Sequence, residues 1–168
     1  MMTVMAQHHP STSSEAIALD TLQRDVLIPQ IQAFLDATAD AEARAVYQAL
    51  LAAVEAMSIP PELQLRLGVI VEVALSSGRV RKLFGPGAEL GLQALFVKTP
   101  RGREVATSIS EVNQALGELS GQTVEHVTTT NRGPGAYALT LKTDKCQIVI
   151  RFEQAGVRVE SLEVDLAG

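Results

Sequence analysis

The sequence predicts an α+β fold, with a helical N-terminal half of about three to four helices packed on a C-terminal antiparallel sheet of about three to five strands. Two observations predict this layout. Apolar residues recur at spacings of three and four in the first half of the chain, whereas they alternate with polar residues from Tyr137 onward. Helices followed by strands are the order expected when helices cover one face of an antiparallel sheet.

The chain has 168 residues, of which 46% are hydrophobic and 20% are charged, so it can bury a sizeable core. Residues 1–14 show no periodicity and are predicted to form a flexible lead. Residues 15–168 are predicted to form a single α+β domain, with a helical part over about 15–82 and an α/β part over about 90–168. Two small subdomains are the alternative, but no Ser/Gly-rich or charged linker separates the halves.

The first two helices are predicted from their apolar stripes. Ser14 is a plausible N-cap for the first, whose stripe has spacings of three and four: Leu19, Leu22 and Val26. Pro29 interrupts the stripe, so this helix either kinks there or restarts. The second helix is predicted over residues 39–57, a stretch rich in Ala, Glu, Leu and Arg.

A third helix is predicted after Pro60 and Pro61, since proline fits a first helical turn. Residues 63–75 are apolar except for three positions: Gln64, Arg66 and Glu72. The richness in Val and Ile would also suit a central strand, but the length and the proline start favour a helix. We expect this helix to be buried on nearly all sides, with residues 67–75 at the centre of the core.

The segment 85–107 is harder to assign. Gly85-Pro86-Gly87 predicts a break, and residues 92–99 fit either a short helix or a strand. Residues 100–103 have the composition of a turn, so a strand over 92–99 would form a hairpin with 103–107. Ser108-Ile109-Ser110-Glu111 matches a capping box, which predicts a helix beginning there and ending at Gly121.

Strands are predicted for the rest of the chain. Tyr137, Leu139 and Leu141 alternate with polar or small residues, as do Ile148, Ile150 and Phe152, and residues 122–130 are a weaker candidate. Turns are predicted at 143–144 and 154–156, and a longer loop at 131–135. In the last strand the apolar positions change from odd to even numbers near Ser161, which predicts a β-bulge.

The sequence also predicts where the protein is located and which classes of partner are disfavoured. The N-terminus has no positive region followed by an apolar one, no apolar run approaches the length of a membrane span, and Cys146 is the only cysteine. We therefore expect a cytoplasmic protein with no membrane contact. Nucleic-acid binding is disfavoured, because the net charge is −5 and aromatic residues make up only 4%.

Positive charge is concentrated in one interval. Residues 79–103 hold six basic residues and a single acid, Glu89, which gives a net charge of +5. Six basic side chains are candidates for binding an anion or a partner. Five lie in this interval, Arg79, Arg81, Lys82, Arg101 and Arg103, and the sixth is Arg132 in the predicted loop at 131–135. The simpler interpretation is that they are solvated and paired with nearby acids.

The sequence offers no catalytic or metal-binding set, and we expect no cofactor. His8 and His9 lie in the predicted lead, and His126 has no His or Cys at ligand spacing. Cys146 shares its strand face with Ile148, so we interpret it as a core residue and not as a nucleophile.

These observations favour a non-enzymatic interaction or accessory module that binds another protein or itself. A small-molecule anion-binding domain or enzyme that uses residues 79–103 is one alternative, and nucleic-acid binding is another. The interaction module predicts an exposed apolar patch, whereas anion binding predicts basic side chains that converge on a concavity. The identity of a partner or substrate, the oligomeric state and the strand order do not follow from the sequence.

Overall fold

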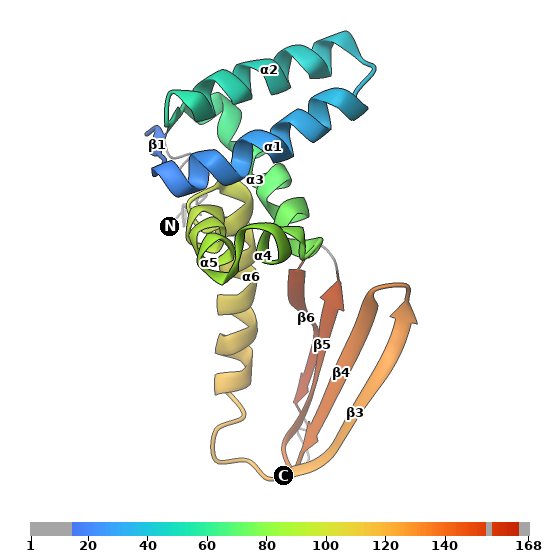
Figure 1. Cartoon of the computed structure of the whole chain (residues 1–168). Helices are drawn as coiled ribbons and strands as arrows, with labels where there is room; N and C mark the ends of the chain where they lie inside the picture. The colour runs from blue at the N-terminus through green and yellow to red at the C-terminus, as the bar shows by residue number, and fades with distance from the viewer. Residues whose placement is uncertain (1–14, 154–155, 165–168) are drawn as a thin grey trace, which may run out of the picture. The chain divides into compact units, whose positions relative to one another are not determined.

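Helices precede an antiparallel sheet along the chain, which confirms the predicted α+β layout (Figure 1). The computed structural model describes residues 15–153 and 156–164, so the predicted lead at 1–14 and the turn residues 154–155 lie outside the described residues. The described part contains six helices, more than the three or four expected, and a four-stranded sheet.

The chain separates into two compact units, one up to Gly102 and one from Arg103 onward. Each unit contains its own cluster of buried apolar side chains. Whether the two units behave as the single domain expected from the sequence stays a prediction.

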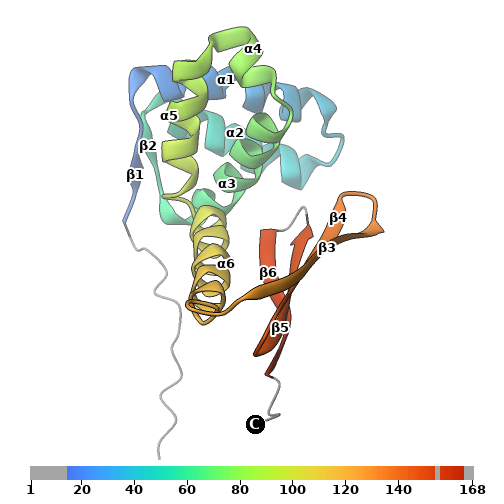
Figure 2. The ribbon, with the colours of Figure 1, turned by 90° about the horizontal axis from the view of Figure 1, so that it is seen from below.

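The first unit is helical, with two short strands that pair antiparallel (Figure 2). Its elements are β1 (Ile17–Ala18), α1 (Thr21–Ala37), α2 (Ala41–Glu55), β2 (Ser58–Ile59), α3 (Pro61–Ser76), α4 (Arg79–Phe84), α5 (Pro86–Phe96) and the first residues of α6 (Pro100–Gly117). The helices predicted over 39–57 and 63–75 are thus confirmed as α2 and α3. Buried side chains from α1, α2, α3 and α5 form the core, including Leu27, Ile31, Leu50, Leu67, Ile70 and Leu92.

The predicted start of the first helix, after Ser14, is wrong. Ile17 pairs with Ile59 as a strand, and α1 begins only after Asp20. The Asp20 carboxylate accepts a hydrogen bond from the Gln23 backbone N–H at 2.7 Å, and the Gln23 side chain accepts one from the Asp20 N–H at 3.0 Å. This capping box fixes the start. Helix α1 then continues through Pro29 and does not restart there.

The hairpin considered for residues 92–107 is wrong, because both segments are helical in α5 and α6. Residues 100–103 form the first turn of α6 and not a loop between strands. Thr99 precedes this turn and is fully buried; its hydroxyl accepts a hydrogen bond from the Gly102 N–H at 3.1 Å and donates one to the Phe96 carbonyl at 2.7 Å. A side-chain cap followed by proline is a helix start that resembles turn chemistry in sequence.

The capping box expected at Ser108 is also wrong, since Ser108 lies in the interior of α6. The helix ends at Gly117, and Gly121 adopts a left-handed φ of 75° in the turn that follows. The predicted break at Gly85-Pro86-Gly87 is confirmed: Gly85 has a φ of 87°, and α5 begins at Pro86.

The second unit consists of the remainder of α6 and a four-stranded meander. The strands are β3 (Val124–Gly133), β4 (Ala136–Thr143), β5 (Cys146–Glu153) and β6 (Gly156–Val164), hydrogen-bonded in that order. Val112, Ala115, Leu116 and Leu119 of α6 and the turn after it pack with the sheet residues Ile148 and Ile150. Because one helix covers four strands, the edges of this sheet face are less protected than its middle.

The β-bulge predicted near Ser161 is confirmed. Val149 pairs with Ser161 while the next residue, Ile150, pairs with Val159, which leaves Glu160 as the extra residue. Leu162 therefore stands opposite Ile148, on the same face as Val159. The loop predicted at 131–135 is shorter than expected, because β3 extends through Gly133.

Candidate functional site

Helix α3 departs most clearly from its sequence prediction. The pattern predicts burial on nearly all sides, yet Leu65, Val69 and Val73 are 58%, 36% and 46% exposed. These three residues are spaced by four, so they form one stripe along the helix. The opposite side is buried as expected, through Leu67, Ile70, Val71 and Ala74. Helix α3 is thus the central core helix of its unit and also presents an apolar stripe to solvent.

A pocket lies beside this stripe, between α2 and α3. Its volume is about 340 Å³, and its lining is Val46 from α2 with Glu62, Leu65, Arg66 and Val69 from α3. Three of the five lining residues are aliphatic, and the two charged ones are exposed. We call this pocket together with the stripe the α2–α3 groove. Its lining combines three aliphatic side chains with one guanidinium and one carboxylate.

Arg66 is held beside the groove by an aromatic contact. Its guanidinium carbon lies 5.4 Å from the centre of the Tyr47 ring, and Tyr47 in turn contacts Phe34 with ring centres 5.6 Å apart. Within residues 15–153 and 156–164, no carboxylate forms an ion pair with Arg66. A guanidinium stacked on a ring can still donate hydrogen bonds at its edge, so Arg66 can receive a carboxylate from a partner.

The basic residues proposed from the sequence are spread over several elements. Arg79, Arg81 and Lys82 lie in α4, Arg101 and Arg103 lie in the first turn of α6, and Arg132 lies in β3. Arg81 pairs with Glu89 at 3.4 Å, and Arg132 pairs with Glu160 at 3.6 Å. The two arginine side chains remain 68% and 49% exposed, so these contacts leave them accessible.

Arg101 has a structural role. Its Nε and Nη2 atoms donate to the two carboxylate oxygens of Glu72 at 3.0 and 3.3 Å, and both side chains are about two-thirds or more buried. This paired contact joins α6 to α3 within the first unit. Arg103 is half-buried and also makes a polar contact. Arg79 and Lys82 are exposed, and within residues 15–153 and 156–164 neither side chain forms an ion pair.

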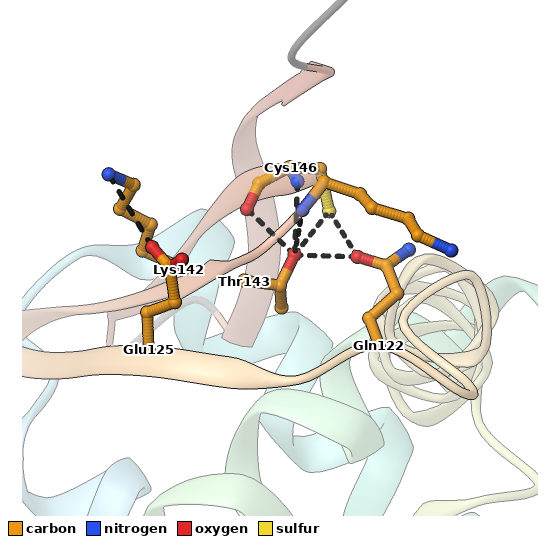
Figure 3. A network of polar contacts seen from close by, with 6 residues as sticks. Gln122, Glu125, Lys142, Thr143 and Cys146 are labelled. Carbon is orange, nitrogen blue, oxygen red and sulfur yellow. Dashed lines mark hydrogen bonds and ion pairs between the residues drawn. The ribbon is translucent and has the colours of Figure 1, made fainter. Parts of the chain in front are cut away.

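Cys146 lies in a polar network at the turn between β4 and β5 (Figure 3). Thr143 is the hub: its hydroxyl oxygen lies 2.6 Å from Gln122 Oε1 and accepts from the Cys146 N–H at 3.0 Å. The Cys146 thiol donates to the same Gln122 oxygen at 3.2 Å. The groups that bond the thiol are uncharged and Cys146 is only 4% exposed, so the interpretation of Cys146 as a core residue is confirmed.

The described residues offer few other candidate metal-binding or catalytic groups. They contain no group of three or more His, Cys, Asp or Glu side chains that could hold a metal ion. His126 is exposed on β3, where its ring contacts the Thr128 hydroxyl. His8 and His9 lie outside the described ranges. Among the helices that the structure describes, none is both long and apolar enough to cross a membrane.

Sequence reasoning missed the residues of the groove, although a signal was present. Glu62 and Arg66 are spaced by four and mark the solvent side of α3, and Leu65, Val69 and Val73 flank that row. An apolar stripe next to such a charged row is unlike the solvent face of an ordinary surface helix.

The chain matches no known family, and neither a curated protein nor a solved structure is detectably similar to it.

Proposed function

We propose that the protein is a non-enzymatic cytosolic interaction module that binds another protein through the α2–α3 groove. One observation carries the proposal: the exposed stripe of Leu65, Val69 and Val73 on a helix whose other face is core. Solvent-exposed apolar residues in a contiguous row, rimmed by charge, are typical of protein-binding surfaces. The single buried cysteine fits a reducing compartment such as the cytosol.

The length of the exposed stripe favours a helical partner segment. Residues 65 to 73 span roughly 12 Å along α3 at 1.5 Å per residue, about two turns of a helix. An amphipathic helix laid along this stripe would place apolar residues at spacings of three and four against it. An acidic side chain on the same segment would meet Arg66, so the expected partner carries an apolar stripe flanked by Asp or Glu.

The anion-binding alternative has less support. Arg81, Arg101 and Arg132 each have a carboxylate partner, and the Arg101 contact joins two helices. A binding site for a small anion needs several cations that are both free and convergent. The accessible pair Arg79 and Lys82 on α4 is the remaining candidate, so this alternative is tested by substituting those two residues alone.

The test is affinity capture from cell lysate with quantitative mass spectrometry, comparing wild type with two matched variants. Leu65→Lys places a charge in the stripe, whereas Leu90→Lys places one on α5, where Leu90 is 64% exposed. Both leucines lie on helices of the first unit and are more than half exposed, so both variants should fold with the wild-type circular dichroism spectrum.

We expect a specific partner to be depleted at least about tenfold with Leu65→Lys and retained with Leu90→Lys, because a buried leucine contributes more than the 1.4 kcal/mol that a tenfold change requires. Equal capture by Leu65→Lys and wild type would refute the groove. Partners that vanish only in an Arg79→Ala/Lys82→Ala variant, or only at high salt, would favour anion or nucleic-acid binding.

A further inference from the structure

The two edges of the sheet in the second unit differ. The sheet order leaves β3 and β6 as edge strands. β6 is interrupted in its middle by the bulge at Glu160, and a bulge that twists an edge is a common protection against pairing with another chain. In β3 the register shifts lie only near its ends, so residues 126–131 pair one by one with β4 in a regular run.

The regular run of β3 is also uncovered. β3 is ten residues long, and every one of its residues is exposed or half-buried. Its sequence from Val127 is Val-Thr-Thr-Thr-Asn, which contains no charge and no proline. Edge strands normally carry Lys, Pro or an inward-pointing charge that discourages pairing. This run of β3 has none of them, and threonine and valine favour the strand conformation.

The apolar face of the sheet continues to this edge. Val127 stands opposite Leu141, which stands opposite Ile148, and Ile148 is fully buried. Val127 itself is 53% exposed. Residues opposite one another in neighbouring strands share a face, so Val127 extends the core face beyond the part that α6 covers. A further strand beside β3 would cover it.

The charges of β3 favour an antiparallel over a parallel arrangement of two copies of the strand. Glu125 lies near its start, where it forms an exposed ion pair with Lys142 of β4 at 3.7 Å, and Arg132 lies near its end, paired with Glu160 of β6 at 3.6 Å. When two copies of β3 run antiparallel, the start of one lies beside the end of the other, so Glu125 of each copy approaches Arg132 of its mate. Exposed ion pairs contribute little, so each of these two residues can exchange its intrachain partner for the residue of the mate. A parallel arrangement would place like charges together, which is unfavourable. The strand is therefore self-complementary about a two-fold axis.

We propose that β3 pairs with β3 of a second copy of the chain, which joins the two four-stranded sheets into one continuous antiparallel sheet. The axis lies within the run from Val127 to Thr129, and the main-chain groups of the two strands exchange hydrogen bonds across it. This surface consists of residues other than those of the α2–α3 groove, so the inference does not depend on the proposed function.

The length of the pairing run sets the expected affinity of the dimer. A run of six residues is roughly 20 Å long at 3.3 Å per residue, which is small for a protein interface. The dimer should therefore be reversible, with a dissociation constant on the order of 10 μM, the strength of a small interface.

The experiment is sedimentation equilibrium of the full chain from about 1 to 200 μM, a range that brackets the expected constant, on wild type, Val127→Lys and Val164→Lys. Val164 is the matched control: it lies on the other edge strand, beside Cys146 of the core face, and is 60% exposed. We expect Val127→Lys to raise the dissociation constant at least about 100-fold, because both copies lose an apolar contact and gain a charge. Val164→Lys should dimerise like wild type.

A cysteine experiment fixes the strand and the axis without destabilising the fold. Single cysteines replace Val127, Thr128 or Thr129 on β3, or Ser161 on β6, and oxidation reports which residue meets its own copy; buried Cys146 serves as the wild-type background. One β3 position should cross-link at least about tenfold faster than Ser161→Cys, since cross-strand partners lie within disulfide reach. A monomer at 200 μM, a dimer that survives Val127→Lys, or cross-linking equal to that of Ser161→Cys would overturn the proposal.

Discussion

Gly102→Ala should destabilise the protein, although glycine to alanine within a helix ordinarily stabilises by about 1 kcal/mol. Gly102 lies in the first turn of α6, where the backbone passes close to the end of α5. A Cβ atom built on Gly102 would lie 1.9 Å from the Phe96 carbonyl oxygen and 2.8 Å from Val97 Cα. Contacts of a real Cβ are essentially never below 3.0 Å, so α6 and α5 would have to separate by about 1.1 Å.

The atoms that would have to move are fixed. The Phe96 carbonyl accepts hydrogen bonds from the Thr99 N–H at 2.9 Å and from the Thr99 hydroxyl at 2.7 Å. Separation would also stretch the cap from Gly102 N–H to Thr99. Overpacking costs about 1–3 kcal/mol and a lost cap about 1 kcal/mol. After subtracting the helix-propensity gain of about 1 kcal/mol, we expect the unfolding free energy to fall by about 1–3 kcal/mol.

Urea unfolding followed by circular dichroism at 222 nm measures this loss. Gly117→Ala is the matched control, since it changes a glycine of the same helix at which an added Cβ would meet nothing within 4 Å. That variant should be stabilised by up to about 1 kcal/mol, as expected for a helix-propensity gain without a clash. If Gly102→Ala unfolds at the same urea concentration as Gly117→Ala, then α5 and α6 do not approach each other this closely.

Three further substitutions test polar contacts, each by urea unfolding. Thr143→Val should cost about 1–3 kcal/mol, because it leaves the Cys146 N–H without its acceptor, whereas Thr140→Val on the same strand should be near neutral. Glu72→Gln should cost about 1–2 kcal/mol by removing the charged partner of Arg101, and an unchanged midpoint would show that this contact is only a surface pair. Asp20→Ala should cost about 1 kcal/mol through loss of the α1 cap, and Asp20→Asn should recover most of it.

The sequence was sufficient to predict elements whose pattern is local. Helix α2 followed from periodicity, helix α3 from its length and its proline start, and the strands β4 and β5 from alternation. The bulge at Glu160 could be located because apolar residues that change parity within one strand stay on one face only if an extra residue is inserted between them. These features depend on residues within a few positions of one another, which a single sequence contains.

The segment 92–107 could not be assigned, because Thr99-Pro100 followed by Arg-Gly-Arg is compatible with both a turn and a capped helix start. The burial of Thr99 decides between them, and burial depends on the packing of α3 against this segment. The predicted helix start at Ser108 was wrong for a related reason. A capping motif does not begin a helix when the helix has already started upstream, because the backbone N–H groups that the cap would bond are already paired.

The groove was missed for a different physical reason. Hydrophobicity shows that α3 must bury apolar area, but the number of neighbours available to cover it is a tertiary property. The core of the first unit needs only one side of α3, through Leu67, Ile70 and Val71. The basic residues show the opposite error. Their clustering was evident in the sequence and suggested a binding site, yet Arg101 joins two helices through Glu72 and does not face an external ligand.

Glu160 makes β6 one residue longer than its pairing with β5 requires. If that residue were deleted, Val157, Val159, Leu162 and Val164 would alternate without interruption, and the strand would keep its apolar side chains on the same face. The deletion would thus spare the core while giving the sheet a second straight edge. Molecules with two pairing edges can join end to end without closing, so the loss of this one residue should convert the proposed closed dimer into fibres.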